Sequence, residues 1–268
     1  EAKSLLSSID DYLLAELDIE LPEIDNSLEN RIFEVSFGQL ESRQDPYFYI
    51  KEFQEIENNI EDSEWPIYHL KDIFEINRGG SPRPIHNYYT DDDDGLNWIR
   101  IGDTKSDSKY ITQTSRKIKP SGARSSRKVV PGDFLLSNSM SFGRPYIMKI
   151  EGYIHDGWLL FRPKTELVNQ DFLHSMLSSK LIYRLFSKAT IGGVVENLNI
   201  DLVKNIKIPL PFLEKQNEIA DHISNIRQAA QQLEQEANEI MENAKAKVER
   251  LILGQWVLLK FKLIIFIY

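Results

Sequence analysis

The 268-residue chain contains no cysteine. Disulfide bonds, thiolate metal sites and cysteine nucleophiles are therefore excluded, and this composition is the one expected of a cytoplasmic protein. Histidine is scarce too, and His69, His86, His155, His174 and His222 show neither the i, i+4 spacing of a helical zinc site nor a neighbouring set of ligands. We interpret each of the five as a solvated or structural residue.

The chain also lacks the glycine patterns that bind phosphate groups. Neither G-x-G-x-x-G nor the lysine-bearing P-loop pattern occurs, and no βαβ pattern of a nucleotide-binding domain is visible. Gly79-Gly80 and Gly192-Gly193 therefore indicate turns. We expect no cofactor, no metal and no catalytic residue in this chain, so that any reaction it serves is carried out by another subunit or by a segment outside it.

Four consecutive carboxylates, Asp91 to Asp94, are followed by Gly95. Neighbouring side chains of this kind point in different directions, whereas a metal site needs ligands that converge at defined distances. The pattern is typical of a solvated loop. A metal-dependent DNA-processing enzyme that uses this loop is the alternative hypothesis.

Charge is spread very unevenly along the chain, whose net charge is −9. Residues 1–64 contain 18 acidic and 4 basic residues, a net charge of −14, whereas residues 97–149 contain 11 basic and 3 acidic residues, a net charge of +8. Local sign rather than total charge decides where a polyanion binds. We therefore expect a polyanion, of which double-stranded DNA is one, to dock at residues 97–149.

Residues 121–128 (SGARSSRK) and 137–144 (SNSMSFGR) combine cations with small hydrogen-bonding side chains, which suits them to phosphates and base edges. We predict a DNA-binding surface made of loops, since this region has no clear recognition helix. The best cationic candidates are Arg100, Arg124, Arg127, Lys128 and Arg144; the candidate base readers are Ser81, Arg83, Asn138 and Ser139; the remaining cations are Lys105, Lys109, Arg116, Lys117 and Lys119. The alternative is a solvated basic surface without a ligand.

An apolar seam runs through residues 213–253, with positions recurring at alternate steps of four and three, which is the repeat of a coiled coil. The seam consists of Ile219, Ile223, Ile226, Ala230, Leu233, Ala237, Ile240, Ala244 and Leu251, interrupted by Lys247. A helix of about 40 residues is about 60 Å long and needs a partner along its length. The alternative is an amphipathic helix lying on its own domain.

The predicted elements together indicate an α+β fold. It consists of a β-rich globular domain and a long C-terminal coiled-coil helix that is paired with a short N-terminal helix. Apolar spacing predicts that N-terminal helix over residues 2–17, covering part of the seam. A polar linker is expected over 52–64 and a helix over 170–188. Strands are expected over residues 32–37, 69–77, 96–101, 115–118, 133–137, 144–150, 158–161 and 206–210.

Four motifs follow one another along the chain: residues 79–82 (GGSP), 96–103 (LNWIRIGD), 125–137 (SSRKVVPGDFLLS) and 205–216 (NIKIPLPFLEKQ), the last running into the long helix. In this order they resemble a specificity subunit of type I restriction-modification systems, over residues 65–253. Residues 43–49 (RQDPYFY) resemble the junction that precedes a recognition domain in these proteins.

The resemblance implies a non-catalytic protein that directs a DNA adenine methyltransferase subunit and an endonuclease/translocase subunit to DNA, with the helix setting the spacing of two half-sites. It implies an N-terminal spacer helix segment at 1–20, a junction at 21–64, a target recognition domain at 65–212 and a coiled-coil spacer helix at 213–253. Full-length members usually carry two recognition domains. We therefore expect a half-subunit that pairs with a second copy of itself, one half of a split gene, or a part of a longer chain; a coiled-coil scaffold is a further alternative.

Residues 254–268 form an almost wholly apolar tail interrupted by Lys260 and Lys262. About 15 residues is short for a membrane span, which needs about 20. We expect a segment buried against a partner or another copy, or a tail altered by a frameshift, rather than membrane insertion.

Overall fold

The computed structural model describes the chain except for residues 26, 29–31, 41–44, 105–107, 139–142, 191–197 and 266–268. The described chain divides into two units, residues 10–220 and residues 1–9 together with 221–268. Two helices, α1 (Ala2–Glu16) and α8 (Leu213–Ile265), contribute residues to both units.

Three sheets organise residues 10–220. The first pairs β1 (Ile67–His69) with β12 (Lys207–Pro209). The second has the order β3-β6-β4-β10-β7, with bounds Tyr89–Thr90, Lys117–Ile118, Leu96–Ile99, Gly152–Ile154 and Arg127–Val129. The third has the order β2-β11-β8-β9-β5, with bounds Phe74–Arg78, Trp158–Pro163, Phe134–Ser137, Pro145–Met148 and Tyr110–Ile111.

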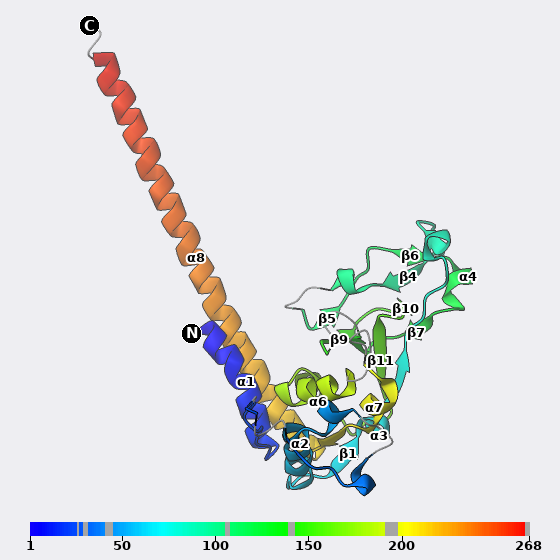
Figure 1. Cartoon of the computed structure of the whole chain (residues 1–268). Coiled ribbons are helices and arrows are strands. Elements are labelled where there is room, and N and C mark those ends of the chain that lie inside the picture. The colour runs from blue at the N-terminus through cyan, green and yellow to red at the C-terminus, as the bar shows by residue number, and fades with distance from the viewer. Residues whose placement is uncertain are drawn as a thin grey trace. The chain divides into compact units, whose positions relative to one another are not determined.

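Short helices connect and flank these strands (Figure 1). The α-helices are α2 (Lys51–Glu61), α3 (Leu70–Ile73), α4 (Pro120–Ala123), α5 (Gln170–Leu177), α6 (Lys180–Thr190) and α7 (Ile200–Asn205). The 3-10 helices are η2 (Phe37–Gln39), η3 (Pro46–Tyr49), η4 (Ile85–Tyr88) and η5 (Ile101–Asp103).

The two five-stranded sheets share one hydrophobic core. Ile99, Val129 and Ile154 from one sheet pack in a single buried cluster with residues of the other, including Trp158, which is fully buried. The indole Nε1 of Trp158 donates a hydrogen bond of 3.2 Å to the carbonyl oxygen of Ile99, so its one polar group is satisfied inside the core. The two sheets are therefore held together by apolar packing and by this bond.

In the SSRKVVPGDFLLS motif, Gly132 and Asp133 lie in the turn between β7 and β8. Gly132 adopts a φ of 95°, a conformation that glycine reaches without steric cost. Asp133, 2% exposed, accepts a bond of 2.8 Å from the backbone N–H of Val130 and two bonds from the guanidinium of Arg162, at 2.8 and 2.6 Å. This aspartate is therefore a structural residue of the fold.

The NIKIPLPFLEKQ motif joins β12 to the first turn of α8. Gln216 is 1% exposed, and its side chain accepts from the backbone N–H of Asn169 at 2.8 Å and donates to the carbonyls of Pro211 at 2.8 Å and Leu167 at 3.2 Å. A buried amide with all of these partners ties two separate stretches of backbone to the start of the helix.

The structure corrects four of the elements expected before residue 190. Residues 32–36 form no strand, because no described strand lies beside them to complete a ladder, and Ile32 and Phe37 are 76% and 90% exposed. The expected linker at 52–64 is largely helix α2, which buries Phe53, Ile56 and Ile60 at helical spacing. The expected strand at 69–77 is interrupted by α3, and the expected helix at 170–188 is divided into α5 and α6 at residues 178–179.

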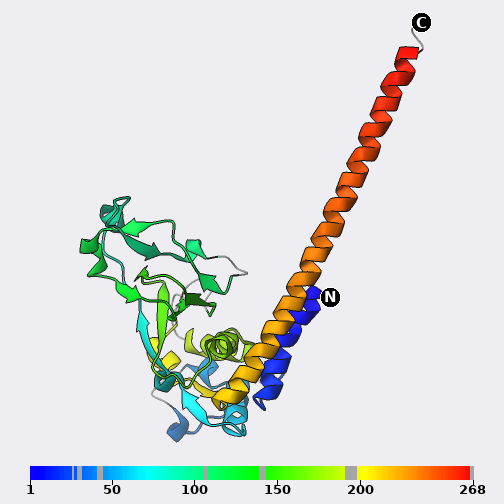
Figure 2. The same ribbon diagram turned by 180° about the vertical axis from the view of Figure 1, so that it is seen from behind.

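The N-terminal and C-terminal helices pair as predicted. Within the unit formed by residues 1–9 and 221–268, the first turns of α1 lie along α8 (Figure 1, Figure 2), and Ile223 and Ala230 of the seam are 2% and 1% exposed. Ile226 and Leu233 are partly buried. The short helix therefore covers the first part of the seam.

The later part of the seam is exposed in this single chain. Ala237 and Ala244 are exposed, and Ile240 and Leu251 are 69% and 61% exposed. Met241 beside them is 57% exposed. The sequence predicts that the coiled-coil helix ends at residue 253. In the structure, α8 continues through the apolar tail to Ile265.

Candidate nucleic-acid interface

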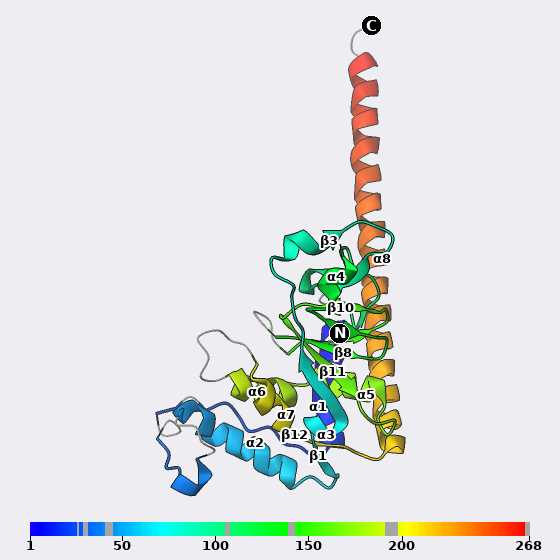
Figure 3. The same ribbon diagram turned by 90° about the vertical axis from the view of Figure 1, so that its right-hand side faces the viewer.

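Most of the predicted cations belong to the sheet β3-β6-β4-β10-β7 and to the loops that join its strands. Figure 1 and Figure 3 place this sheet and α4 at one end of the unit formed by residues 10–220, and helix α2 at the other end. Helix α2 carries the carboxylates of Glu52, Glu55, Glu57 and Glu61. The clustered cations therefore lie mainly around this sheet, together with the four carboxylates of the Asp91–Asp94 turn between β3 and β4. Local positive charge at the cations favours a polyanion there.

Arg124 and Arg127 are the clearest candidates for phosphate contacts. Arg124 caps the C-terminus of α4, Arg127 begins β7, and both side chains are exposed. Among the described residues, no carboxylate forms an ion pair with either guanidinium. Lys128, next along β7, pairs with Glu151 at 2.9 Å, so that part of its charge is neutralised.

Several other predicted cations contact neighbouring groups of the same unit, three of them at this sheet and Lys109 at helix α5. Arg116 stacks over the ring of Tyr89 at 5.5 Å. Lys117 and Lys119 donate to the carbonyls of Asp92 and Asn87, at 3.4 and 3.0 Å, and Lys109 forms an ion pair with Asp171. These contacts leave their positive charges near the surface but restrict where the side chains can reach.

Three predicted residues, Ser81, Arg83 and Arg100, line one open depression of about 840 Å³. Its walls include the aromatic rings of Trp98 and Tyr89. Cations beside aromatic rings are suited to nucleic acid, because guanidinium groups bind phosphates and base edges while rings contact bases. The depression is therefore the most developed feature of the candidate interface.

Asp103 holds Arg100 in place at this depression. One carboxylate oxygen accepts from the backbone N–H of Arg100 at 2.9 Å, and the other accepts from the hydroxyl of Ser115 at 2.6 Å and from the Arg100 guanidinium at 3.4 Å. Burial by itself would raise the pKa of Asp103, but the hydrogen bonds from Ser115 and Arg100 outweigh it and hold this pKa below its usual range. The carboxylate is charged at neutral pH and fixes the arginine that the sequence predicted.

Asp156 and His155, which also line the depression, are not among the site residues predicted from the sequence. Asp156 lies in the turn between β10 and β11 and bonds both Ser81 and Arg83. His155, expected to be a solvated or structural residue, lies half-buried among Trp98, Trp158 and the wall of the depression. No sequence signal marked them, since they are 75 and 74 residues from Ser81 along the chain.

Acidification should destabilise the protein through His155. Burial lowers the pKa of this imidazole, whose Nδ1 accepts a bond of 2.9 Å from the backbone N–H of Gly157. The folded protein therefore binds the proton less readily than the unfolded chain, and stability falls as the pH drops below the ordinary histidine pKa of 6.5. Each pKa unit by which folding lowers the pKa of His155 adds about 1.4 kcal/mol to the free energy of unfolding that is lost on full protonation.

The measurement is the free energy of unfolding by urea between about pH 7.5 and pH 5.5. The variant His155→Gln should lose less stability over this interval than wild type, and His86→Gln, at an exposed position, serves as the control. Equal pH dependence in wild type and His155→Gln would contradict the prediction.

The remaining predicted site residues are not brought together with this depression. Asn138 is 1% exposed, and its amide oxygen accepts from the backbone N–H of Leu198 at 3.0 Å, so it is not available to read a base in this structure. Arg144 is exposed just before β9 in the other sheet. Lys105 and Ser139 lie outside the described residues.

Nothing in the described part of the chain supports the metal hypothesis. No group of three or more histidine, aspartate or glutamate side chains there is placed to hold a metal ion. The Asp91–Asp94 segment forms a turn, in which Asp92 accepts bonds from the hydroxyl of Thr90 at 2.6 Å and from the backbone N–H of Gly95 at 3.0 Å. No helix within the described residues has both the length and the apolar character needed to cross a bilayer.

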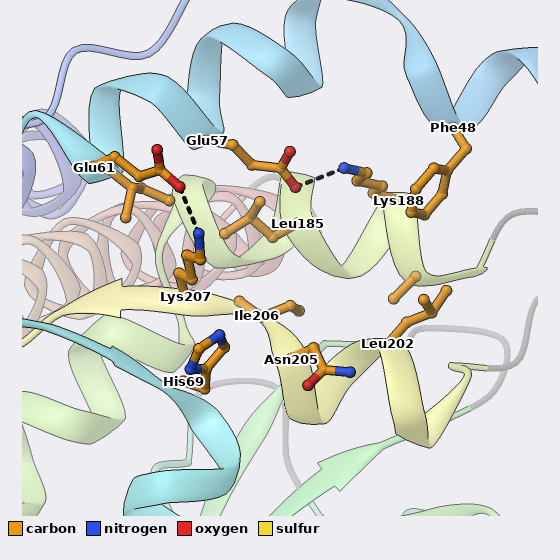
Figure 4. Close-up of a pocket in the computed structure, with 12 residues that line it drawn as sticks. Phe48, Glu57, Glu61, His69, Leu185, Lys188, Leu202, Asn205, Ile206 and Lys207 are labelled. Atoms are coloured by element: carbon orange, nitrogen blue, oxygen red, sulfur yellow. Dashed lines mark hydrogen bonds and ion pairs between the residues drawn. The ribbon is translucent and has the colours of Figure 1, made fainter. Parts of the chain in front are cut away.

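A second cavity, of about 420 Å³, lies among α2, α6, α7 and β12 (Figure 4). Its charged groups are paired with one another: Lys188 with Glu57 and Lys207 with Glu61, each at 2.5 Å. Lys188 also lies 4.3 Å from the ring centre of Phe48. His69, which also lines the cavity, lies 3.3 Å from the carboxylate of Asp72. The lysines and glutamates thus neutralise each other, and among the described residues that line the cavity they leave no unpaired cation for an anion.

Comparison with known families matches the model described as the type I restriction modification DNA specificity domain to residues 62–243. The match covers more than half of the chain. It includes both five-stranded sheets, the depression and the first part of α8.

Two curated relatives share this similarity. The chain is 28% identical over 163 residues to the type I restriction enzyme EcoBI specificity subunit of Escherichia coli, covering 59% of this chain and 33% of that subunit. It is 26% identical over 203 residues to the type I restriction enzyme MjaIX specificity subunit of Methanocaldococcus jannaschii, covering 72% of this chain and 46% of that subunit. The chain thus spans less than half the length of these relatives.

Solved structures show the same fold. The HsdS subunit from Thermoanaerobacter tengcongensis superposes with a TM-score of 0.56 at 18% identity, covering 87% of this chain and 46% of that one. A chain of a type I R-M system studied for its complex assembly and conformational transition gives a TM-score of 0.56 at 18% identity, with coverage of 93% and 51%.

Proposed function

The chain belongs to the type I restriction modification DNA specificity domain family, and from this premise we propose that it is a sequence-specific DNA-binding specificity subunit that reads one half-site. In this role it directs an adenine methyltransferase and an endonuclease/translocase to their target. It does not itself catalyse the making or breaking of covalent bonds. The observation that carries the proposal is the family match over residues 62–243, which includes the basic sheet and its depression.

The basic sheet supplies the two kinds of contact that such a subunit needs. Exposed guanidinium groups such as Arg124 and Arg127 suit phosphates, which position a protein on DNA without reading its sequence. Arginines held in fixed geometry, such as Arg100 beside Asp103, suit base edges. Positioning and reading can therefore be performed by neighbouring parts of one surface.

Helix α8 sets the distance between two DNA-reading modules. Its 53 residues extend for about 80 Å at about 1.5 Å per residue. A helix of this length can separate two DNA-reading modules, and the protein geometry then fixes the spacing of the half-sites. The exposed second half of the seam requires a further helix to cover it, and we propose a second copy of this chain, or the other half of a longer subunit, as its source.

The test is DNA binding and turnover by the purified chain. We expect salt-dependent affinity for duplex DNA and no methylation or cleavage with a divalent metal alone. When the chain is combined with its methyltransferase, we expect adenine methylation within a defined sequence. Cleavage by the isolated chain would favour the metal-enzyme alternative, and the absence of any salt-dependent affinity for DNA would favour a scaffold.

A further inference from the structure

The loop after β2 is pressed against the turn between β10 and β11. Gly79 and Gly80 donate backbone bonds of 2.9 and 3.1 Å to the carbonyls of Trp158 and Ile154. A Cβ at Gly79 would lie 2.1 Å from the carbonyl oxygen of His155, so only glycine permits this approach. The two glycines of the GGSP motif therefore set the distance between the next residues and Asp156.

At this distance, Asp156 holds two side chains of the loop. The hydroxyl of Ser81 donates to one carboxylate oxygen at 2.5 Å, and the guanidinium of Arg83 donates to the other at 3.0 Å. The side chain of Arg83 is 76% exposed and that of Asp156 is 49% exposed. The hydrogen bond from Ser81 holds the pKa of Asp156 below its usual range, so the carboxylate is charged at neutral pH.

The pair still has hydrogen-bonding capacity that faces solvent. A guanidinium has five N–H donors, of which Arg83 directs one at Asp156. An ionised carboxylate has about four acceptor positions, so Asp156 can accept further bonds beyond those from Ser81 and Arg83. Donors and an acceptor are therefore presented side by side at the rim of the depression lined by Trp98 and Arg100.

The carboxylate argues against a phosphate as the partner of Arg83. A phosphate bound by this guanidinium would lie close to the negative charge of Asp156, and the repulsion would oppose the attraction. Arg124 and Arg127, which have no such carboxylate partner among the described residues, do not face this penalty. A neutral partner with both acceptors and a donor suits the Arg83–Asp156 pair better.

We infer that Arg83 and Asp156 together read one G·C base pair from the major groove. Guanine presents two adjacent acceptors, N7 and O6, which match an arginine fork, and its partner cytosine presents the N4 amino donor, which matches a carboxylate. An A·T pair offers no two adjacent acceptors on one base. Ser81 is the positioning residue that orients the carboxylate. This inference rests on the proposed function and names the base pair that this part of the surface reads.

The experiment is selection of bound duplexes from a randomised double-stranded DNA library by the full chain, followed by sequencing. Wild type should enrich a sequence with one invariant G·C pair that depends on this site. Arg83→Lys keeps the charge but loses the fork, and Asp156→Asn keeps the shape but loses the carboxylate. Each should reduce discrimination at that one position by about 5- to 150-fold. The salt dependence of binding should stay unchanged in Arg83→Lys, which conserves the charge.

The matched control is Glu55→Gln, which alters an exposed carboxylate paired with Lys51 on α2, away from the sheet. It should leave every position unchanged. Both test positions are exposed, and melting of each variant checks its folding; if one variant does not fold, the other decides.

The outcomes separate the inference from the proposed function. If wild type enriches a sequence and both variants enrich the same one, or bind all sequences more weakly in equal measure, the inference is overturned and the proposed function stands. If wild type enriches no sequence at all, the proposed function itself fails.

Discussion

Duplicating residues 237–243 of α8 should lengthen the unspecified gap in the DNA target by about three base pairs. These seven residues form one repeat of the seam, with Ala237 and Ile240 as its apolar members, so the duplication keeps the seam in phase. Seven residues add about 10.5 Å of helix, and one base pair occupies about 3.4 Å of the duplex. The half-site bases should not change, because the proposed reading residues lie outside the helix.

The gap is measured by mapping methylated adenines in the DNA of cells that carry the variant chain and its methyltransferase partner. Glu239→Gln, an exposed change within the duplicated segment, alters no length and should leave the gap as in wild type. An unchanged gap in the duplication variant, or altered half-site bases, would rule out a spacing role for α8.

Replacing both Arg124 and Arg127 with alanine should weaken binding to every DNA sequence alike. Each lost phosphate contact is expected to reduce the slope of log affinity against log salt by about one, so the double variant should lose about two. The loss should be largest at low salt, where counterion release contributes most. Sequence preference should persist, since neither residue forms part of the proposed base-reading pair.

This prediction is measured by fluorescence anisotropy of a labelled duplex at several salt concentrations. The control replaces Lys51 and Lys207 with alanine, which removes the same charge from residues that pair with Glu55 and Glu61 outside the basic sheet. Equal slopes for wild type and the Arg124/Arg127 variant would remove these residues from the interface.

The sequence predicts the helices and most strands where apolar spacing is regular. The seam of α8 and the N-terminal helix α1 follow directly from such spacing. Strands β4, β8, β9 and β11 follow from short β-branched or aromatic runs bounded by turn-forming residues. Helix α2 was missed because its acidic composition resembles a linker, although Phe53, Ile56 and Ile60 repeat at helical intervals. Helix α3 is a single turn between two strands, too short to produce a periodic signal.

The charge of the interface follows from composition, but its geometry does not. The local excess of lysine and arginine predicts a basic surface on residues 97–149. Whether a given cation is exposed, as Arg127 is, or donates to a backbone carbonyl, as Lys119 does, depends on neighbours that folding supplies. Asp156 illustrates this limit, because its role arises only when the Gly79–Gly80 loop packs against a turn from a remote part of the chain.

The most direct measurement is the sequence context of methylated adenines in DNA modified by the wild-type chain together with its methyltransferase. We predict a split sequence, with two specified parts separated by a fixed number of unspecified bases, and no modification when this chain is omitted. Methylation without sequence preference, or the same pattern in the absence of this chain, would contradict its role as the DNA-reading subunit.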